Sequence, residues 1–585
     1  MAAKAPKECN TILAEFFAEN TIKKLNEKHQ TIFNPSQFLK DIFDVVCQCF
    51  PANFDHENEV NIVTGVGKFS LLDFSPRICE MFSSTIILQA SAEYLKDLDS
   101  SKKYHQCLII CKVLAEIFKN CSCEWIIGID SIKAQDLKLL ETSDLEEQNR
   151  NITQFHIFLL KFINLMSLDL TKLNDCPKLK LYPGILQLCF LVLKKLSENS
   201  TVEVFRNLWL SIQKKVLCEI VMICIQQVGD QCWALDDCKK MAMAVLESLI
   251  VMCGCRDVLG LLCGNGGKTL KERDCCFFPN GVLRSVLEKM KTFMSKNKLP
   301  DYPVAVHIIV WSIRNMKHPY LGEHISMILP PLLMLVDDYR VENRVTGIET
   351  LSHVIENMNA TELCWYGRAN MIYDALHHRI RTNQPEVMRV LQLCLLKIIK
   401  VIEPSPKRPI ASPKMNKCDE NFQIILTSME FESKIVMRRA YCSNLALFID
   451  HMGITIVRHL TRLLRVVFGY LEIGDGDTED WRLLMLDILK SILLNAWPKV
   501  PNYMDDILRC LMKVVIDVSM SSVALTLKHS MFEKIENCLV LLLCLCGESV
   551  RNQLECMTSG IGLNEAEELI TRALDRYNSN PHIEM

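Results

Sequence analysis

The feature that most constrains the fold is a repeating helical pattern that begins near residue 301. Apolar residues recur there at steps of three or four, in segments separated by short breaks at intervals of roughly 20 residues. Two consecutive segments give a period close to the ~40 residues of HEAT-like repeats. Hydrophobic residues make up 49% of the 585 residues, whereas glycine and proline number only 21 and 20, which favours long helices over many short strands. We therefore predict an all-α fold, an α-solenoid of HEAT/armadillo-like helical repeats.

The pattern divides the chain into two regions. Residues 300–585 form the regular array, and residues 1–299 are less regular, so we expect there a divergent helical region with loop inserts at about 55–73 and 257–280. The expected helices of the array include 325–336, 341–358, 434–452, 454–472 and 479–496. Residues 403–417 are rich in proline and basic residues, which predicts a solvated loop inside the array. Ser405 and Ser412 each precede a proline in this loop, which is either unmodified or a phosphate acceptor.

Residues 329–353 show one such repeat in detail. An apolar helical segment contains Pro330 and Pro331, which we expect to bend its backbone. Asp337 or Asp338 follows at the position where a carboxylate can cap the next helix, and the apolar pattern then resumes. Two antiparallel helices joined by a tight acidic turn are one repeat of an α-solenoid.

The amino-acid sequence of this segment resembles the Tel-two-interacting protein two family. The resemblance rests on the two prolines, the Asp337-Asp338-Tyr339 turn, Glu342-Asn343, Gly347 and residues 351–353. Similar blocks follow in the same order at 360–378, at 437–472 and at Trp497-Pro498. Together they cover about 250 residues, roughly 300 to 550, whereas the N-terminal half matches weakly.

The resemblance implies a helical-repeat scaffold without an active site. The family supplies one subunit of the Triple T (TTT) cochaperone complex, so the implied partners are the Tel-two protein and the first Tel-two-interacting protein. Through that complex it implies indirect links to the ninety-kilodalton heat-shock chaperone, RuvB-like ATPase cochaperones and phosphatidylinositol-3-kinase-related kinases (PIKKs), and hence to DNA-damage and nutrient signalling. The alternative is a HEAT or armadillo adaptor of nuclear transport or another protein-interaction scaffold.

A basic cluster in the second half is the strongest polar pattern. Arg458, Arg462 and Arg465 fall on one face of the expected helix 454–472, and Arg438 and Arg439 precede it by one helix. Two interpretations stay open, a solvated or internally paired face and a surface for an acidic protein partner. The candidate partner-interface residues are Asp337, Asp338, Tyr339, Glu342, Arg438, Arg439, Arg458, Arg462 and Arg465.

Several motifs resemble nucleotide-binding, calcium-binding or catalytic motifs but lack a feature that the site requires. Residues 264–269 (GNGGKT) lack the glycine that a phosphate loop requires, because Leu262 stands there. Residues 474–480 (GDGDTED) open like a calcium loop, but Asp480 and Leu486 replace its required glycine and bidentate glutamate. Adjacent aspartates such as 337 and 338 point in different directions, which does not suit paired acid–base catalysis. We therefore predict no enzyme, with no catalytic, cofactor-binding or metal-binding residues.

Charge and cysteine usage indicate the compartment. The net charge of -3 gives no global attraction to nucleic acid or to an anionic membrane, so we expect neither as a partner. The N-terminus lacks the apolar core of a signal peptide, and no run approaches the roughly 18 apolar residues of a membrane span. None of the 28 cysteines forms a Cys-x-x-Cys pair, which favours reduced, mostly buried thiols. We expect a cytoplasmic and nuclear protein.

Overall fold

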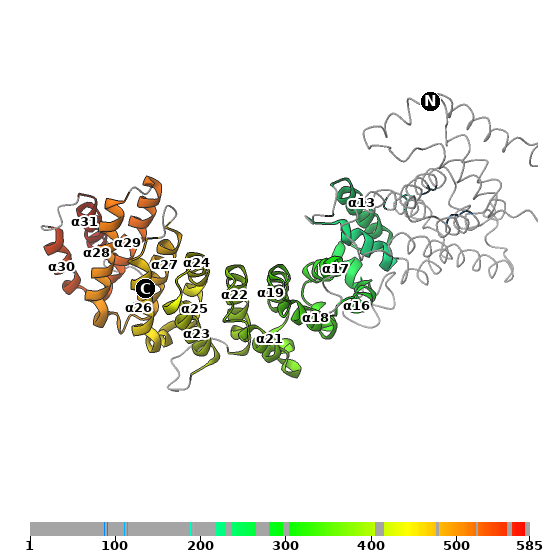
Figure 1. Cartoon of the computed structure of the whole chain (residues 1–585), viewed down its shortest axis with the longest axis horizontal. Coiled ribbons are helices and arrows are strands. Elements are labelled where there is room, and N and C mark those ends of the chain that lie inside the picture. Colours follow the sequence, from blue (N-terminus) through cyan, green and yellow to red (C-terminus); the bar gives the residue numbers. More distant parts are fainter. Residues whose placement is uncertain are drawn as a thin grey trace, which may run out of the picture. The chain divides into compact units, whose positions relative to one another are not determined.

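The fold is described from a computed structural model (Figure 1). The described residues are 217–229, 236–264, 280–295, 303–403, 415–474, 479–521, 524–558 and 564–579, with a few single positions besides. Every regular element among these residues is a helix, which confirms the all-α prediction. The predicted insert at 55–73 lies outside the described residues, as do residues 404–414 of the proline-rich loop, with Ser405 and Ser412.

The chain divides into two compact units, residues 1–316 and 317–585. In the described part of the first unit, α13 (Asp236–Met252) packs on α14 (Val258–Cys263), and α16 (Leu283–Lys291) packs on α17 (Pro303–Arg314). The start of the expected loop 257–280 is thus helical. The carboxylate of Asp257 accepts a hydrogen bond from the Gly260 N–H at 2.8 Å, and Leu261 and Leu262 are fully buried. A capped first turn and two core side chains suffice to form this short helix.

The second unit is a succession of helix pairs, coloured from green to red in Figure 1. The first helices are α18 (Leu321–Val336), α20–η4–α21 (Ala360–Cys364, Trp365–Gly367, Arg368–His377), α23 (Lys417–Phe431), η5–α26 (Gly453–His459, Leu460–Leu471), η6–α28 (Val500–Tyr503, Met504–Met520) and α30 (Glu548–Thr558). The second helices are α19 (Val341–Glu356), α22 (Pro385–Ile402), α24–α25 (Ile435–Cys442, Leu445–Met452), α27 (Asp480–Asn495), α29 (Leu525–Cys546) and α31 (Asn564–Ser579).

Each second helix packs on the second helix of the next pair, from α19 through α22, α24, α27 and α29 to α31. The first helices form another layer, in which α18 contacts α21 and α26 contacts both α23 and α28. Two layers of helices with nearest-neighbour packing are the architecture of a HEAT-like α-solenoid, as predicted.

The first pair shows why its sequence is suited to this packing. Pro330 and Pro331 stand inside α18, which begins at Leu321, four residues before the expected start. Gly347 brings α19 close to α18, since a Cβ atom at this position would lie 2.7 Å from the Cβ of Leu335. Any larger residue would push the two helices apart.

Two expected helices are interrupted. The segment 434–452 breaks between α24 and α25 at Ser443 and Asn444, where the Asn444 amide donates to the Arg389 carbonyl of α22 at 2.8 Å. The segment 454–472 begins as the 3-10 helix η5 after Gly453, whose φ is +54°. Residues 435–471 together have the length and hydropathy of a membrane span. They are four short helices that pack against α22, α23 and α27, and most of their large apolar side chains are buried.

Cysteines of the described residues behave as small hydrophobes. They are free, and most are buried, which agrees with the prediction of reduced thiols. Burial raises the pKa of Cys394 and of Cys538 to about 12.

Candidate partner-binding surface

The turn between α18 and α19 holds the first group of predicted residues. Asp337 follows the last residue of α18, is exposed, and forms an ion pair with Arg379 of the next repeat. Tyr339 is 73% exposed and Glu342 is exposed. This turn therefore presents an aromatic ring and two carboxylates to solvent.

Asp338 differs from Asp337 because its side chain is turned inward. Its carboxylate accepts hydrogen bonds from the Arg340 N–H at 2.8 Å and from the Asn343 amide at 3.0 Å. Burial alone would raise the pKa of Asp338, but these hydrogen bonds and the Arg340 charge outweigh it and hold the pKa below its ordinary value. The N-cap position of α19 is Arg340, which makes no side-chain capping bond, so neither aspartate caps this helix as predicted. Asp338 instead stabilises the turn before α19.

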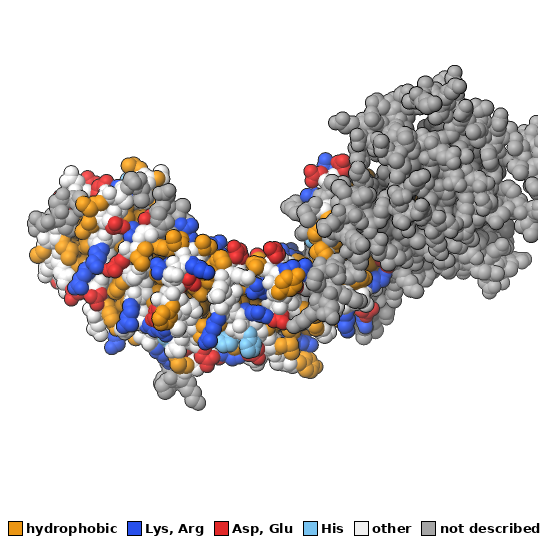
Figure 2. All heavy atoms as spheres, in the orientation of Figure 1, with side chains coloured by type: hydrophobic (Ala, Val, Ile, Leu, Met, Phe, Trp, Pro, Cys, Tyr) orange, Lys and Arg blue, Asp and Glu red, His pale blue; other side chains and the backbone are white. Residues whose placement is uncertain are grey.

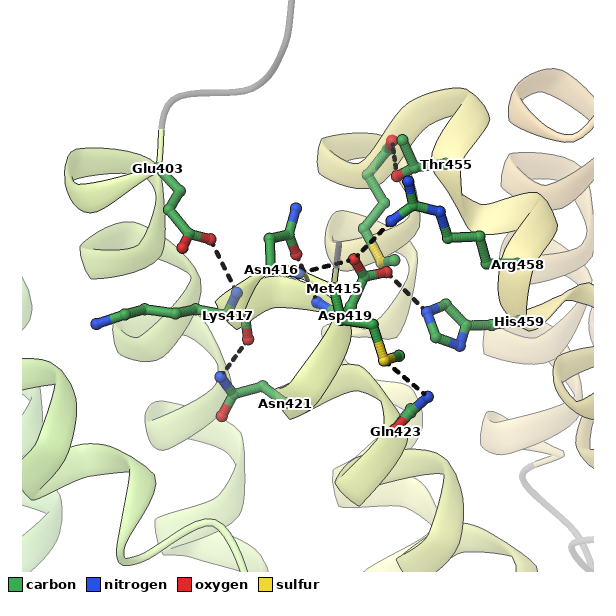
Figure 3. A network of polar contacts seen from close by, with 11 residues as sticks. Glu403, Met415, Asn416, Lys417, Asp419, Asn421, Gln423, Thr455, Arg458 and His459 are labelled. Atoms are coloured by element: carbon green, nitrogen blue, oxygen red, sulfur yellow. Dashed lines mark hydrogen bonds and ion pairs between the residues drawn. The ribbon is translucent and has the colours of Figure 1, made fainter. Parts of the chain in front are cut away.

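The centre of the second group is a buried carboxylate at the start of α23 (Figure 3). Asn416 and Asp419 form a capping box, in which each side chain accepts the other residue's backbone N–H. The other contacts of the fully buried Asp419 carboxylate come from η5, namely His459 Nε2 at 2.8 Å and Arg458 at 3.1 Å. Burial would raise the pKa of Asp419, but the bonds from His459 and Asn416 and the Arg458 charge lower it overall.

Arg462 and Arg465 lie on α26. Arg462 donates to both carboxylate oxygens of Glu430 on α23, at 2.6 and 2.7 Å, and to the Thr427 hydroxyl at 2.8 Å. The Arg462 hydrogen bonds are the main reason that the pKa of Glu430 is lowered. Arg465 is exposed. Arg458 belongs to η5 and not to α26, so the expected single helix is interrupted, but Arg458 and Arg462 both contact α23.

Arg438 is held inside the array by aromatic rings. Its guanidinium lies 4.8 Å from the ring centroid of Tyr470 and 5.4 Å from that of Trp481, and its Nε donates to the Glu432 carbonyl at 2.8 Å. Cation–π contacts of this kind link α24 to the next repeat. Arg439 beside it is half-buried. Arg438, Arg458 and Arg462 are therefore joined to neighbouring repeats, and Arg465 remains the most accessible of the basic candidates.

Apart from Tyr339, sequence reasoning missed a row of exposed apolar side chains at the turns within the helix pairs. Because the second helices pack side by side, the turns that precede them lie along one edge of the second unit. We call the following exposed residues the turn edge: Tyr339, Phe431, Ile435, Val436, Ile473, Met520 and Leu525. Phe431 is 83% exposed. The sequence could have indicated their exposure, because these residues stand at helix ends rather than on the apolar face that each helix buries. Figure 2 shows hydrophobic side chains interspersed with charged ones on the visible face of this unit.

The described residues were compared with the requirements of metal-binding and phosphate-binding sites. They contain no group of three His, Cys, Asp or Glu side chains that could hold a metal ion. Of the glycine-rich segment 264–269, Gly264 is described and the remainder is not. In the calcium-like segment 474–480, residues 475–478 lie outside the described set, and the buried Glu479 faces Arg482, which pairs with Asp517 at 2.7 Å.

Comparison with known proteins shows which family part of this chain resembles. Residues 289–473 match the model of the Tti2 family. TELO2-interacting protein 2 of Homo sapiens is 32% identical over 54% of this chain and 60% of its own length, and the Mus musculus protein is 32% identical over 53% and 60%. The chain thus spans about 60% of the length of these curated relatives.

Among solved structures, that of Kap121p aligns at 12% identity with a TM-score of 0.41, covering 99% of this chain and 57% of Kap121p. A structure of importin beta aligns at 12% identity with a TM-score of 0.38, covering 91% and 66%. The family match includes the α18–α19 turn, the Asp419 centre and the basic residues of α26. Residues 289–473 of the chain are therefore similar to the Tti2 family, as the resemblance of residues 329–353 indicated.

Proposed function

We propose that this chain is a non-catalytic scaffold subunit of a TTT-type cochaperone assembly. In this proposal it binds the Tel-two protein and the first Tel-two-interacting protein, and acts with the ninety-kilodalton heat-shock chaperone and RuvB-like ATPases to mature and stabilise PIKKs in cytoplasm and nucleus. The proposal is supported by the similarity of residues 289–473 to the Tti2 family and by the name of the relatives, which describes them as interacting with TELO2.

The observation that carries the proposal is the turn edge. Phe431, Ile435 and Val436 form its densest part, at the turn between α23 and α24, and each is about half or more exposed. Apolar side chains in contact with water favour association, and here rigid helices hold them in place. The Arg462–Glu430 and Asp419–His459 contacts fix α23 against the next repeat, so the surface is ordered before a partner arrives.

The test is affinity purification of the full chain from cells, followed by mass spectrometry. We expect the wild-type chain to recover the Tel-two protein and the first Tel-two-interacting protein. The double variant Phe431→Glu/Val436→Glu should recover at least about tenfold less, because two carboxylates would be buried in the interface. Leu447→Glu is the matched control, since Leu447 is an exposed apolar residue of α25 outside the turn edge.

Arg465→Glu tests the basic candidates. Reversal of Arg458 or Arg462 would also break contacts to Asp419 or Glu430, whereas Arg465 is exposed on α26. An acidic partner predicts reduced recovery with Arg465→Glu at low salt. Recovery of importin-type cargo in place of the two Tel-two-related subunits would refute the proposed function. Equal recovery by all variants would refute the assigned surface.

A further inference from the structure

The first helix of the second pair contains a strained corner. α20 ends at Cys364, and the 3-10 turn Trp365–Gly367 separates it from α21. Tyr366 adopts φ +57° and ψ +23°, and Gly367 adopts φ +69°, both in the left-handed region. That region is unfavourable for a residue with a Cβ atom, so Tyr366 occupies it because the surrounding structure imposes it.

The corner turns large side chains outward. Trp365 is 58% exposed, Tyr366 is 88% exposed, and Met371 on the next turns of α21 is about half exposed. Leu363 and Ile372, by contrast, are fully buried and anchor the corner to the core. Two neighbouring aromatic rings held in water by a fixed backbone match the composition of protein-interface hot spots.

Among the described residues, the cations at this corner form no side-chain ion pair of the kind seen elsewhere in the unit, although the Glu403 carboxylate accepts the Lys417 backbone N–H at 2.9 Å. Arg379, Arg462 and Lys513 each pair with a carboxylate of the preceding repeat. Arg368 instead lies 5.1 Å from the Tyr366 ring centroid, and Lys417 lies 4.0 Å from that of Tyr373.

Lys417 also donates to the Asn370 side-chain oxygen at 2.9 Å, which places it beside α21. Within the part of the chain that the structure describes, neither Arg368 nor Lys417 forms a side-chain ion pair. Both keep unused capacity to bind carboxylates.

We propose that this corner, formed by Trp365, Tyr366, Arg368, Met371 and Lys417, binds an acidic segment of a partner protein that also carries apolar side chains. The apolar side chains contact Trp365, Tyr366 and Met371, and the carboxylates pair with Arg368 and Lys417. The charge complementarity favours an acidic occupant over a second basic surface. The identity of the partner rests on the proposed function, whereas the chemistry of the segment rests on the corner itself.

The test places a photoreactive benzoylphenylalanine at position 366 of the full chain in cells, with the same group at the exposed Trp497 as control. Cross-linked peptides are identified by mass spectrometry. We expect position 366, and not position 497, to cross-link to a segment of a TTT subunit rich in Asp and Glu. Added Arg368→Glu should lower the yield at least about tenfold, because it replaces the cation with a carboxylate that repels an acidic segment.

Three outcomes would overturn the inference: cross-links to this chain alone, cross-links to basic segments, or a yield at position 366 that does not respond to Arg368→Glu. Recovery of the Tel-two protein without such a cross-link would reject the corner and leave the proposed function standing. An Arg368-dependent cross-link to an acidic segment outside the TTT subunits would support the corner as a binding site and reject the proposed function.

Discussion

The Nε2 atom of His459 lies 2.8 Å from Oδ1 of Asp419, forty residues earlier in the chain. The same order recurs along the second unit, where an acidic residue pairs with a basic residue of the next repeat. The pairs are Asp337–Arg379, Glu356–Lys397, Glu430–Arg462, Glu472–Lys513, Asp487–Lys534 and Glu536–Arg576. The paired residues lie roughly one repeat apart, between 32 and 47 positions, so these ion pairs tie neighbouring helix pairs together. Between the second and third helix pairs, the hydrogen bonds from Gln392 to the Tyr441 carbonyl and from Asn444 to the Arg389 carbonyl do so.

Replacing Asp419 tests the buried member of this series. Asp419→Asn removes the charge that faces Arg458 and His459, and we expect a loss of about 2 kcal/mol in the free energy of unfolding. For a unit of this size, the thermal midpoint should fall by about 4 to 8 °C. Glu430→Gln is the control, because its partner Arg462 is partly exposed and the cost should stay below about 1 kcal/mol. Equal shifts for the two variants would contradict the central role of Asp419.

The stabilisation by Asp419 should depend on pH in one direction. Its pKa in the folded chain is below the ordinary value of 3.8, so the charged form stabilises the fold above that value. The contribution is lost as the pH falls through the lower, folded pKa. Thermal scans should therefore show the full difference between wild type and Asp419→Asn above about pH 5, and a shrinking difference below about pH 4. A constant difference across this range would refute the assignment.

Two glycines in helices should respond oppositely to alanine. Gly347→Ala places a Cβ 2.7 Å from the Leu335 Cβ, and we expect a destabilisation of about 1 to 3 kcal/mol despite the better helix propensity of alanine. Gly469 lies in α26 with open space around it, so Gly469→Ala should stabilise by about 0.5 to 1 kcal/mol. Denaturant midpoints of the two variants check the prediction, which fails if both shift the same way.

Thiol reactivity should follow burial. Cys364 is exposed, whereas Cys394 and Cys538 are fully buried with pKa values of about 12. Brief alkylation of the native chain near pH 8 should modify Cys364 at least about a hundredfold faster than the other two. Peptide mass spectrometry after labelling, with a urea-unfolded sample as reference, measures the ratio. Rapid native labelling of Cys394 would show that this part of the core opens readily.

The positions of the predicted residues show which structural features the sequence pattern alone can predict. The prediction that Asp337 or Asp338 caps α19 was wrong, because the N-cap position is Arg340 and Asp338 accepts that residue's N–H from within the preceding turn. The continuous helix expected for Arg458, Arg462 and Arg465 was wrong, since Gly453 introduces a 3-10 segment, but Arg458 and Arg462 both contact α23. The pairing of Arg462 with Glu430 joins residues on separate helices, which helical periodicity does not reveal.

The sequence by itself determined the helical class and the repeat period and indicated the family resemblance, because each depends on residue type and local spacing. Tertiary structure decided which charged side chains are used inside the array and which remain for a partner. Arg438 illustrates the reason, since its contacts with Tyr470 and Trp481 arise when successive repeats stack. The exposure of Phe431 and Tyr366 is decided in the same way, because the packing of whole helices determines which ends face water.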